Sequence, residues 1–218
     1  MKDSKTFAVL ATDVAVLTID EGVLKVLLTQ ATSKNFKGML TLPGGLVGHE
    51  ERTEEAVVRI LEEIMTKTDY YNEQLYTFDD PGRDPEGRVV TVAYLMLVSG
   101  DEAKRITRKD ASWHAVKTLP KLAYDHNEVV KTAAKRLAGK LTYTNIVYAL
   151  MPLEFTLSDL QKTYETALEL SLDKRNFIKK IKSLNLIEKT THKVEGSAHR
   201  PATLYRFRER KYKRVDLF

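Results

Sequence analysis

The sequence predicts an α+β protein of two domains, an α/β domain over residues 1–139 and a helical domain with a terminal β-hairpin over residues 140–218. Strand-like and helix-like patterns alternate in the first part, whereas from about Tyr143 the chain reads as helices followed by two short strand-like runs. The charge changes at the same place. Residues 141–218 carry 15 Lys/Arg against 9 Asp/Glu, while residues 1–140 carry 20 against 21. A basic excess confined to one part of a chain indicates a module that binds a polyanion.

The composition excludes several other classes of protein. The 218 residues include no cysteine, so a disulfide scaffold and a thiolate metal site are both excluded. No apolar run reaches the ~18 residues that a membrane span requires, and the first residues lack the apolar segment of a signal peptide. We therefore expect a cytoplasmic protein without membrane contact.

The elements of the first part follow from the spacing of apolar residues. Residues 12–29 predict a β-hairpin that turns at Asp20-Glu21-Gly22, and residues 38–47 predict a strand that ends in Pro43-Gly44-Gly45. Apolar side chains at i, i+4 and i+8 predict a helix over 53–66, which Thr53 would cap. We expect further strands at 89–98 and 112–116 and a second helix at 127–137.

One segment of this part resembles a known motif. Gly45, Glu51, Arg59, Leu61 and Glu63 stand at the spacing of the Nudix box, and Leu42-Pro43-Gly44-Gly45 precedes them as in that family. The resemblance implies a Nudix-like α/β/α sandwich as the first domain.

The segment departs from the box at the positions that hold the metal. Nudix hydrolases cleave nucleoside diphosphate linkages with Mg²⁺ held by carboxylates, and a similar active enzyme would carry Glu at positions 60, 63 and 64. These positions share one helix face, but here they are Ile60, Glu63 and Ile64. Magnesium requires oxygen ligands, which isoleucine lacks. We expect no metal, no cofactor and no hydrolase activity, unless other carboxylates such as Glu62 hold the ion.

A Nudix cavity without its metal is still able to bind a small molecule. The turn-rich loop 79–88 carries Arg83 and Arg88, whose guanidinium groups suit phosphate or ribose oxygens. We assign ligand contacts to these two arginines and to Arg59 and Glu63 of the box. The alternative for the loop is a solvated turn.

The second part predicts a winged helix-turn-helix. Thr156 and Asp159 form a capping-box pattern for a helix over 157–170. After a short connection, Asp173 would cap a basic second helix over 173–184, and a β-hairpin follows. Base edges and phosphates would be contacted by the outward side chains of this helix and by two residues of the wing, namely Lys174, Arg175, Asn176, Lys179, Lys180, Lys193 and Arg200. The alternative is a solvated basic helix.

With these motifs in place, nearly the whole chain resembles the NrtR family of Nudix-related transcriptional regulators. The resemblance rests on Tyr124-Asp125-His126, Leu160-Gln161, Tyr164-Glu165, Leu172-Asp173-Lys174-Arg175-Asn176-Phe177 and Arg200-Pro201-Ala202. It implies a homodimer that binds a palindromic operator in double-stranded DNA and represses genes of NAD metabolism in response to ADP-ribose. It also leaves open a regulator of pentose use that senses arabinose or xylose. His126 is either a ligand contact or an interface histidine. An active Nudix pyrophosphatase with a basic tail is the competing enzymatic hypothesis.

Overall fold

The computed structural model describes residues 7–66, 70–193 and 202–217. It contains two compact units. One comprises Met1–Leu17, Lys25–Met96 and Arg105–Ala133, and the other comprises Thr18–Leu24, Leu97–Lys104 and Ala134–Phe218.

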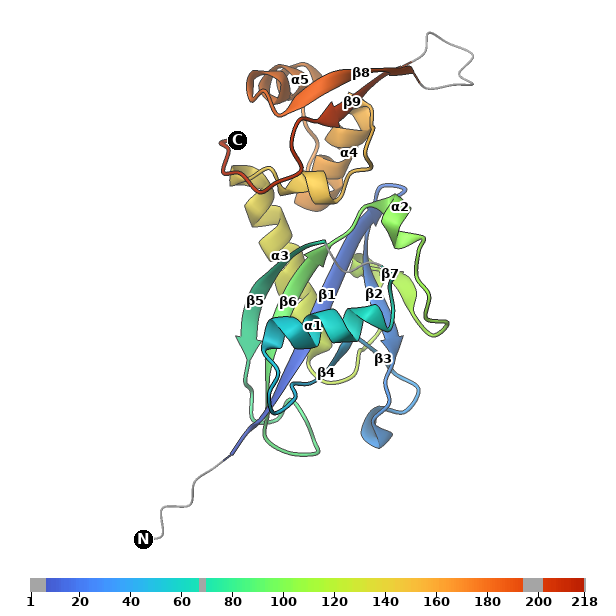
Figure 1. Cartoon of the computed structure of the whole chain (residues 1–218), viewed down its shortest axis with the longest axis vertical. Coiled ribbons are helices and arrows are strands. Elements are labelled where there is room, and N and C mark those ends of the chain that lie inside the picture. Colours follow the sequence, from blue (N-terminus) through green and yellow to red (C-terminus); the bar gives the residue numbers. More distant parts are fainter. Residues whose placement is uncertain (1–6, 67–69, 194–201, 218) are drawn as a thin grey trace. The chain divides into compact units, whose positions relative to one another are not determined.

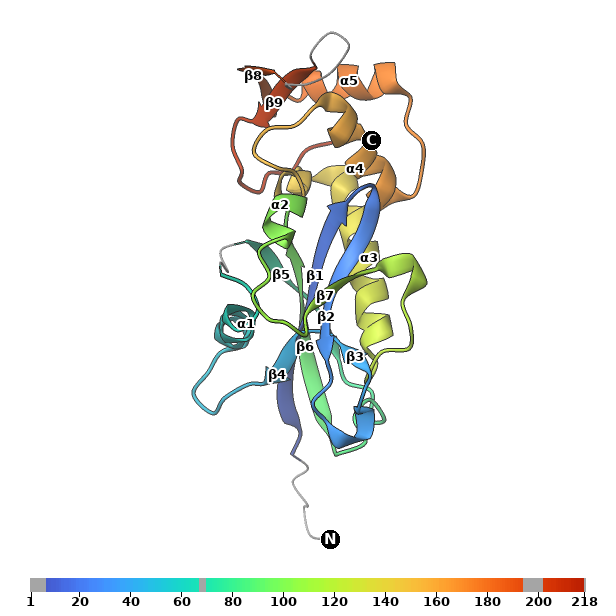
Figure 2. The same ribbon diagram turned by 90° about the vertical axis from the view of Figure 1, so that its right-hand side faces the viewer.

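A seven-stranded sheet lies mainly in the first unit. Its strands run in the order β3-β2-β1-β6-β5, while β4 also pairs with β1 and β7 with β2. The strands are β1 (Val9–Asp20), β2 (Val23–Gln30), β3 (Leu40–Thr41), β4 (Gly44–Leu46), β5 (Tyr71–Phe78), β6 (Val89–Leu97) and β7 (Ser112–Ala115). Helix α1 (Thr53–Glu62) covers one face of the sheet, and the beginning of α3 (His126–Tyr143) covers the other (Figures 1 and 2). This is the α/β/α sandwich expected from the sequence.

Two tight places in the sheet explain particular residues. At the β1–β2 turn, Glu21 and Gly22 adopt φ values of 52° and 77°, the left-handed pair that joins two-residue hairpins. In β4, Gly44 pairs with Asp13 of β1, and a Cβ at Gly44 would lie 2.2 Å from Asp13 Oδ1. Only glycine fits there, so the Pro-Gly-Gly turn allows β4 to pass directly beside the Asp13 carboxylate.

The boundaries of several elements differ from those expected. Thr53 does not cap α1 but is its first residue, because Arg52 occupies the N-cap position; the Thr53 hydroxyl instead bonds to the Tyr94 hydroxyl at 2.7 Å. The helix ends at Glu62 rather than residue 66, while α3 extends six residues beyond the predicted end, through Gly139. Strand β5 was not predicted, because only Leu75 among its eight residues is buried and the apolar alternation is weak.

The second unit contains the expected helix-turn-helix and hairpin. Its elements are α2 (Gly100–Ala103), the end of α3, α4 (Leu157–Leu168), α5 (Lys174–Ser183), β8 (Ile187–Lys193) and β9 (Thr203–Phe207). Short 3₁₀ turns complete the two units at Lys34–Phe36, Val116–Thr118 and Ile146–Ala149.

Aromatic contacts hold the helix-turn-helix and its hairpin together. Tyr164 of α4 packs edge-on against Phe177 of α5, with ring centroids 5.5 Å apart. Phe155 packs against Phe207 at 5.0 Å, and its backbone exchanges two hydrogen bonds with Tyr205 of β9. The hairpin is therefore fixed to the segment just before α4.

None of the helices in the described part of the chain has the length and hydropathy that a membrane span requires.

Candidate functional site

A cavity of about 520 Å³ lies within the first unit. Its wall is made by β1, the segment from Thr29 to Leu46, one side of α1, part of the loop before β6, and the residues that begin α3. The volume lies within the range of small-molecule sites, roughly 300–1,000 Å³. Of the four residues assigned to a ligand from the sequence, Arg59, Glu63 and Arg83 line this cavity.

The box residues Glu51 and Arg59 form a two-pronged ion pair at the mouth of the cavity. Arg59 Nε donates to Glu51 Oε1 at 2.7 Å and Nη2 donates to Oε2 at 2.8 Å, while the Gly48 N–H also donates to Oε2. The hydrogen bond from Arg59, aided by the one from Gly48, lowers the pKa of Glu51 to about 2. Arg59 also donates to the Leu46 carbonyl at 3.0 Å, so the pair fastens the loop between β4 and α1 to the helix.

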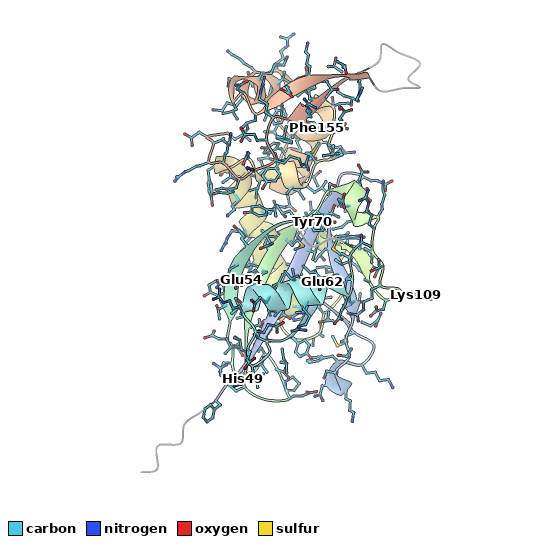
Figure 3. All side chains as sticks on the ribbon, viewed as in Figure 1. His49, Glu54, Glu62, Tyr70, Lys109 and Phe155 are labelled. Atoms are coloured by element: carbon cyan, nitrogen blue, oxygen red, sulfur yellow. The ribbon has the colours of Figure 1, made fainter. Side chains whose placement is uncertain are left out.

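The three positions of α1 and its C-terminal end that were compared with a metal site carry two buried isoleucines and one exposed glutamate. Ile60 and Ile64 are 6% and 0% exposed, and Ile60 Cδ1 lies 3.7 Å from the place of a Cβ on Gly45. Glu63 is exposed and lies 3.9 Å from Arg108 Nη1. Glu54 and Glu62, at the two ends of α1 (Figure 3), are exposed as well. The part of the chain that the structure describes contains no group of three His, Cys, Asp or Glu residues suited to a metal ion.

The cavity floor contains a buried charge network. Arg83 forms a bidentate pair with Asp125, at 3.1 Å from Nε and 2.8 Å from Nη2, and Nη2 also lies 3.2 Å from Asp13 Oδ2. Burial acts to raise the pKa of Asp13, but the contacts with His126 and Arg83 outweigh it, so this pKa is lower than usual. Arg83, which the sequence assigned to phosphate or ribose oxygens of a ligand, therefore already holds its loop to β1 and to the start of α3.

His126 joins three parts of the cavity wall. It is 2% exposed and its Nδ1 receives the Leu42 N–H at 3.0 Å, with the Thr41 hydroxyl 2.9 Å away. A backbone N–H only donates, so Nδ1 carries no proton. The proton is therefore on Nε2, which faces Asp13 Oδ2 at 3.4 Å. His126 lines the cavity, and both its contact with a ligand and its place in an interface between copies stay predictions.

The rim of the cavity is formed by two loops that are bonded to each other. Glu86 Oε1 accepts hydrogen bonds from the Ser33 hydroxyl at 2.7 Å and from Asn35 Nδ2 at 3.1 Å. Arg88 does not line the cavity. Its Nη1 donates to the Asp79 carbonyl at 2.5 Å and closes the base of its own loop. A ligand contact by Arg88 therefore stays a prediction that its position does not favour.

Sequence reasoning overlooked Asp13 and Asp125, although one signal was present. Asp13 lies within a strand whose central residues are almost all apolar and buried, and a charge in such a run requires a buried partner. That partner is Arg83, which is 70 residues away in the sequence. No local pattern identifies it.

A second candidate site is the exposed face of α5. Asp173 caps this helix as expected, accepting the Asn176 N–H at 2.8 Å, and Phe177 and Ile181 are buried. The five residues of the helix that were assigned to DNA are all exposed, namely Lys174, Arg175, Asn176, Lys179 and Lys180. Lys193 ends β8, and Arg200 lies outside the described residues.

Comparison with known families and proteins gives a consistent result. Residues 9–133 match the model of the NUDIX domain, and residues 147–207 match the NrtR DNA-binding winged helix domain. The chain is 32% identical to the ADPR-responsive transcriptional repressor NtrR of Acinetobacter baylyi over 203 residues, covering 89% of this chain and 80% of the relative. It is 38% identical to an ADP-ribose pyrophosphatase of Methanocaldococcus jannaschii, over 54% of this chain and 70% of that enzyme.

Two solved structures of Shewanella oneidensis NrtR are similar as well. The complex with a 27mer DNA superimposes with a TM-score of 0.82 at 31% identity, over 91% of this chain and 93% of that one. The NUDIX domain of the same protein, in complex with ADP ribose, matches with a TM-score of 0.52 at 32% identity, over 63% of this chain and 93% of that domain.

Proposed function

Because the chain belongs to the NrtR family of Nudix-related transcriptional regulators, we propose that it is a DNA-binding repressor controlled by ADP-ribose in its Nudix unit. One observation carries the proposal. A single chain joins a Nudix unit that contains a 520 Å³ cavity to a winged helix whose second helix exposes a row of basic side chains. Hydrolysis of a small molecule does not require a winged helix with exposed basic side chains. The regulated genes would be those of NAD metabolism.

The residues on the α1 face do not fit the magnesium cluster of an active Nudix enzyme. Two of its three positions carry the buried side chains of Ile60 and Ile64, which offer no oxygen. Glu63 alone would leave most of the coordination sphere to water. We therefore propose that the unit binds its ligand without hydrolysing it, although a pyrophosphatase is among its relatives.

The chemistry of the cavity favours a diphosphate ligand over a bare pentose. Arg59, Arg83 and Arg108 all line it, and each is paired with a carboxylate, so an incoming diphosphate would share or replace those partners. A pentose has no anionic group for three guanidinium groups. Two relatives support the same choice, one described as ADPR-responsive and one crystallised with ADP ribose. We propose Arg59, Arg83 and Glu63 as ligand contacts and retain a pentose sensor as the alternative.

We propose that residues 1–139 bind the effector and residues 140–218 bind the operator. Lys174, Arg175, Asn176, Lys179 and Lys180 would enter or flank the major groove, and Lys193 and Arg200 would contact the duplex from the wing. A palindromic operator requires two recognition helices, so the active form would be a homodimer. This role implies a cytoplasmic location.

The test combines two measurements on the full chain. A duplex is first selected by the protein from a random library, and ADP-ribose, NAD, arabinose and xylose are then compared by thermal shift and by fluorescence anisotropy of that duplex. We expect ADP-ribose both to raise the melting temperature and to release the duplex. If arabinose or xylose does so and ADP-ribose does not, the pentose alternative holds. If no duplex is enriched, the chain is not a sequence-specific regulator.

A further inference from the structure

Two polar side chains of α4 bond to the backbone of a single residue, Leu172, in the turn before the recognition helix. Glu165 Oε1 accepts the Leu172 N–H at 2.9 Å, and Gln161 Nε2 donates to the Leu172 carbonyl at 2.9 Å. Gln161 Nε2 also donates to Glu165 Oε1 at 3.0 Å. Gln161 and Glu165 are one helical turn apart, so together they bind both the donor and the acceptor of Leu172. We call these contacts the Leu172 clamp.

We propose that Gln161 and Glu165 are positioning residues for DNA recognition, because the clamp fixes the point at which α5 begins. The inference rests on the proposed function and identifies residues that determine its selectivity. Leu172 immediately precedes Asp173, whose side chain caps α5. The clamp therefore acts on the last residue before the cap, although it touches no residue assigned to DNA.

The other contacts of α5 do not by themselves fix the point at which the helix begins. The contact between Tyr164 and Phe177 and the burial of Ile181 orient the apolar face of the helix toward the core. A packed apolar face fixes the rotation of a helix about its axis more tightly than it fixes the position of the helix along that axis. Glu169 ends α4 in the left-handed conformation, with φ 55°, and the Leu170 N–H returns to the Glu165 carbonyl. The connection to Leu172 is then only two residues long, and the clamp fixes its far end.

The state of Glu165 agrees with this geometry. The hydrogen bonds from the Leu172 N–H and from Gln161 lower the pKa of its carboxyl, so the ionised acceptor is the form present at neutral pH. Glu165 is thus an anion inside a domain that binds a polyanion, which is unfavourable electrostatically. Its removal by itself should strengthen attraction to phosphates, whereas loss of the clamp should weaken base reading. The two effects have opposite signs and are therefore separable.

Glu165→Ala and Glu165→Gln form a matched pair, since both remove the charge and only glutamine retains an acceptor for the Leu172 N–H. Affinities of the full chain are measured for the duplex selected from a random library and for a scrambled duplex of equal length. We expect Glu165→Ala to lower the ratio of the affinity for the selected duplex to that for the scrambled duplex about 10-fold, the scale of one lost bidentate base contact. Binding of the scrambled duplex should not become weaker. Glu165→Gln should keep the ratio within about 2-fold, and ADP-ribose affinity should not change in either variant.

Gln161→Ala supplies an independent arm, because it removes the bond to the Leu172 carbonyl and leaves the acceptor in place. Hydrogen exchange should become faster at residues 170–174 in Glu165→Ala and remain as in wild type in Glu165→Gln. An unchanged affinity ratio in both alanine variants would overturn the positioning role, as would a ratio reduced equally in Glu165→Gln. If the wild type does not distinguish the two duplexes, the proposed function itself fails.

Discussion

Asp13→Asn tests the buried charge network at the cavity floor. The substitution keeps the shape of the side chain. Shape matters here because the space beside Gly44 is narrow, and a Cβ on Gly44 would lie only 2.2 Å from Asp13 Oδ1. It removes the negative charge that faces Arg83 at 3.2 Å and His126 at 3.4 Å.

The cost follows from the partner that Arg83 retains. Removing one member of a buried ion pair costs about 3–5 kcal/mol when the other charge is left alone. Arg83 still has the bidentate contact with Asp125, so the loss is closer to that of one hydrogen bond to a charged group, about 1.5–3 kcal/mol. We expect a decrease of ~2 kcal/mol in the unfolding free energy of the first unit.

The effect should depend on pH with a definite sign. The folded pKa of Asp13 is lower than the ordinary value of 3.8, so the unfolded chain binds the proton more readily. The stabilisation is complete above the unfolded pKa and is lost as pH falls through the folded one. Wild type and Asp13→Asn should therefore differ most near neutral pH and converge below about pH 4.

Trp113 provides the assay, because it is the single tryptophan of the chain and lies in β7 of the first unit. Its fluorescence in urea should show a midpoint about 1 M lower for Asp13→Asn at pH 7, for a slope of roughly 2 kcal/mol/M. Glu128→Gln is the control, since Glu128 is exposed and its pair with Lys131 is worth under about 1 kcal/mol. Equal midpoints for wild type and Asp13→Asn, or a difference that grows in acid, would refute the role of the network.

Three further predictions concern catalysis and DNA recognition. With ADP-ribose and Mg²⁺ the full chain should release no AMP, because Ile60 and Ile64 offer no metal ligands; turnover that EDTA abolishes would contradict this. Arg175→Ala should weaken binding of the selected duplex by about 1–3 kcal/mol and relax base preference, whereas Lys180→Ala should weaken selected and scrambled duplexes equally; a specificity unchanged in Arg175→Ala would show that another element reads the bases. Asp173→Ala removes the N-cap of α5 and should cost about 1 kcal/mol of stability, measured as a lower melting temperature by circular dichroism; an unchanged melting temperature would show that the cap contributes nothing.

Most of the fold could be predicted from local patterns. The hairpin turn at Glu21-Gly22, the capping box of Thr156 and Asp159 and the N-cap of Asp173 each depend on residues close in the sequence, and all three are present. Strand β5 could not be predicted, because it lies at the edge of the sheet and buries a single side chain. Its place is determined by pairing with β6 rather than by its own apolar pattern.

The cavity was harder to predict than the fold. The box spacing identified Arg59 and Glu63 as lining residues, and the loop pattern identified Arg83. The partners of Arg83 could not be predicted from the sequence. Asp13 and Asp125 lie 70 and 42 residues away, and their pairing with Arg83 depends on the tertiary fold. Arg88 shows the converse, because an arginine in the same loop donates to the backbone instead of reaching the cavity.

The central claim is that ADP-ribose and operator DNA are coupled through this chain. The most direct measurement titrates the selected duplex in the presence and absence of saturating ADP-ribose, and then titrates ADP-ribose with and without the duplex. Coupling between sites is typically about 1–3 kcal/mol, so ADP-ribose should raise the Kd for the duplex roughly 5- to 150-fold. Linkage requires the duplex to raise the Kd for ADP-ribose by the same factor. If ADP-ribose binds the full chain and leaves the Kd for the duplex unchanged, the claim is wrong.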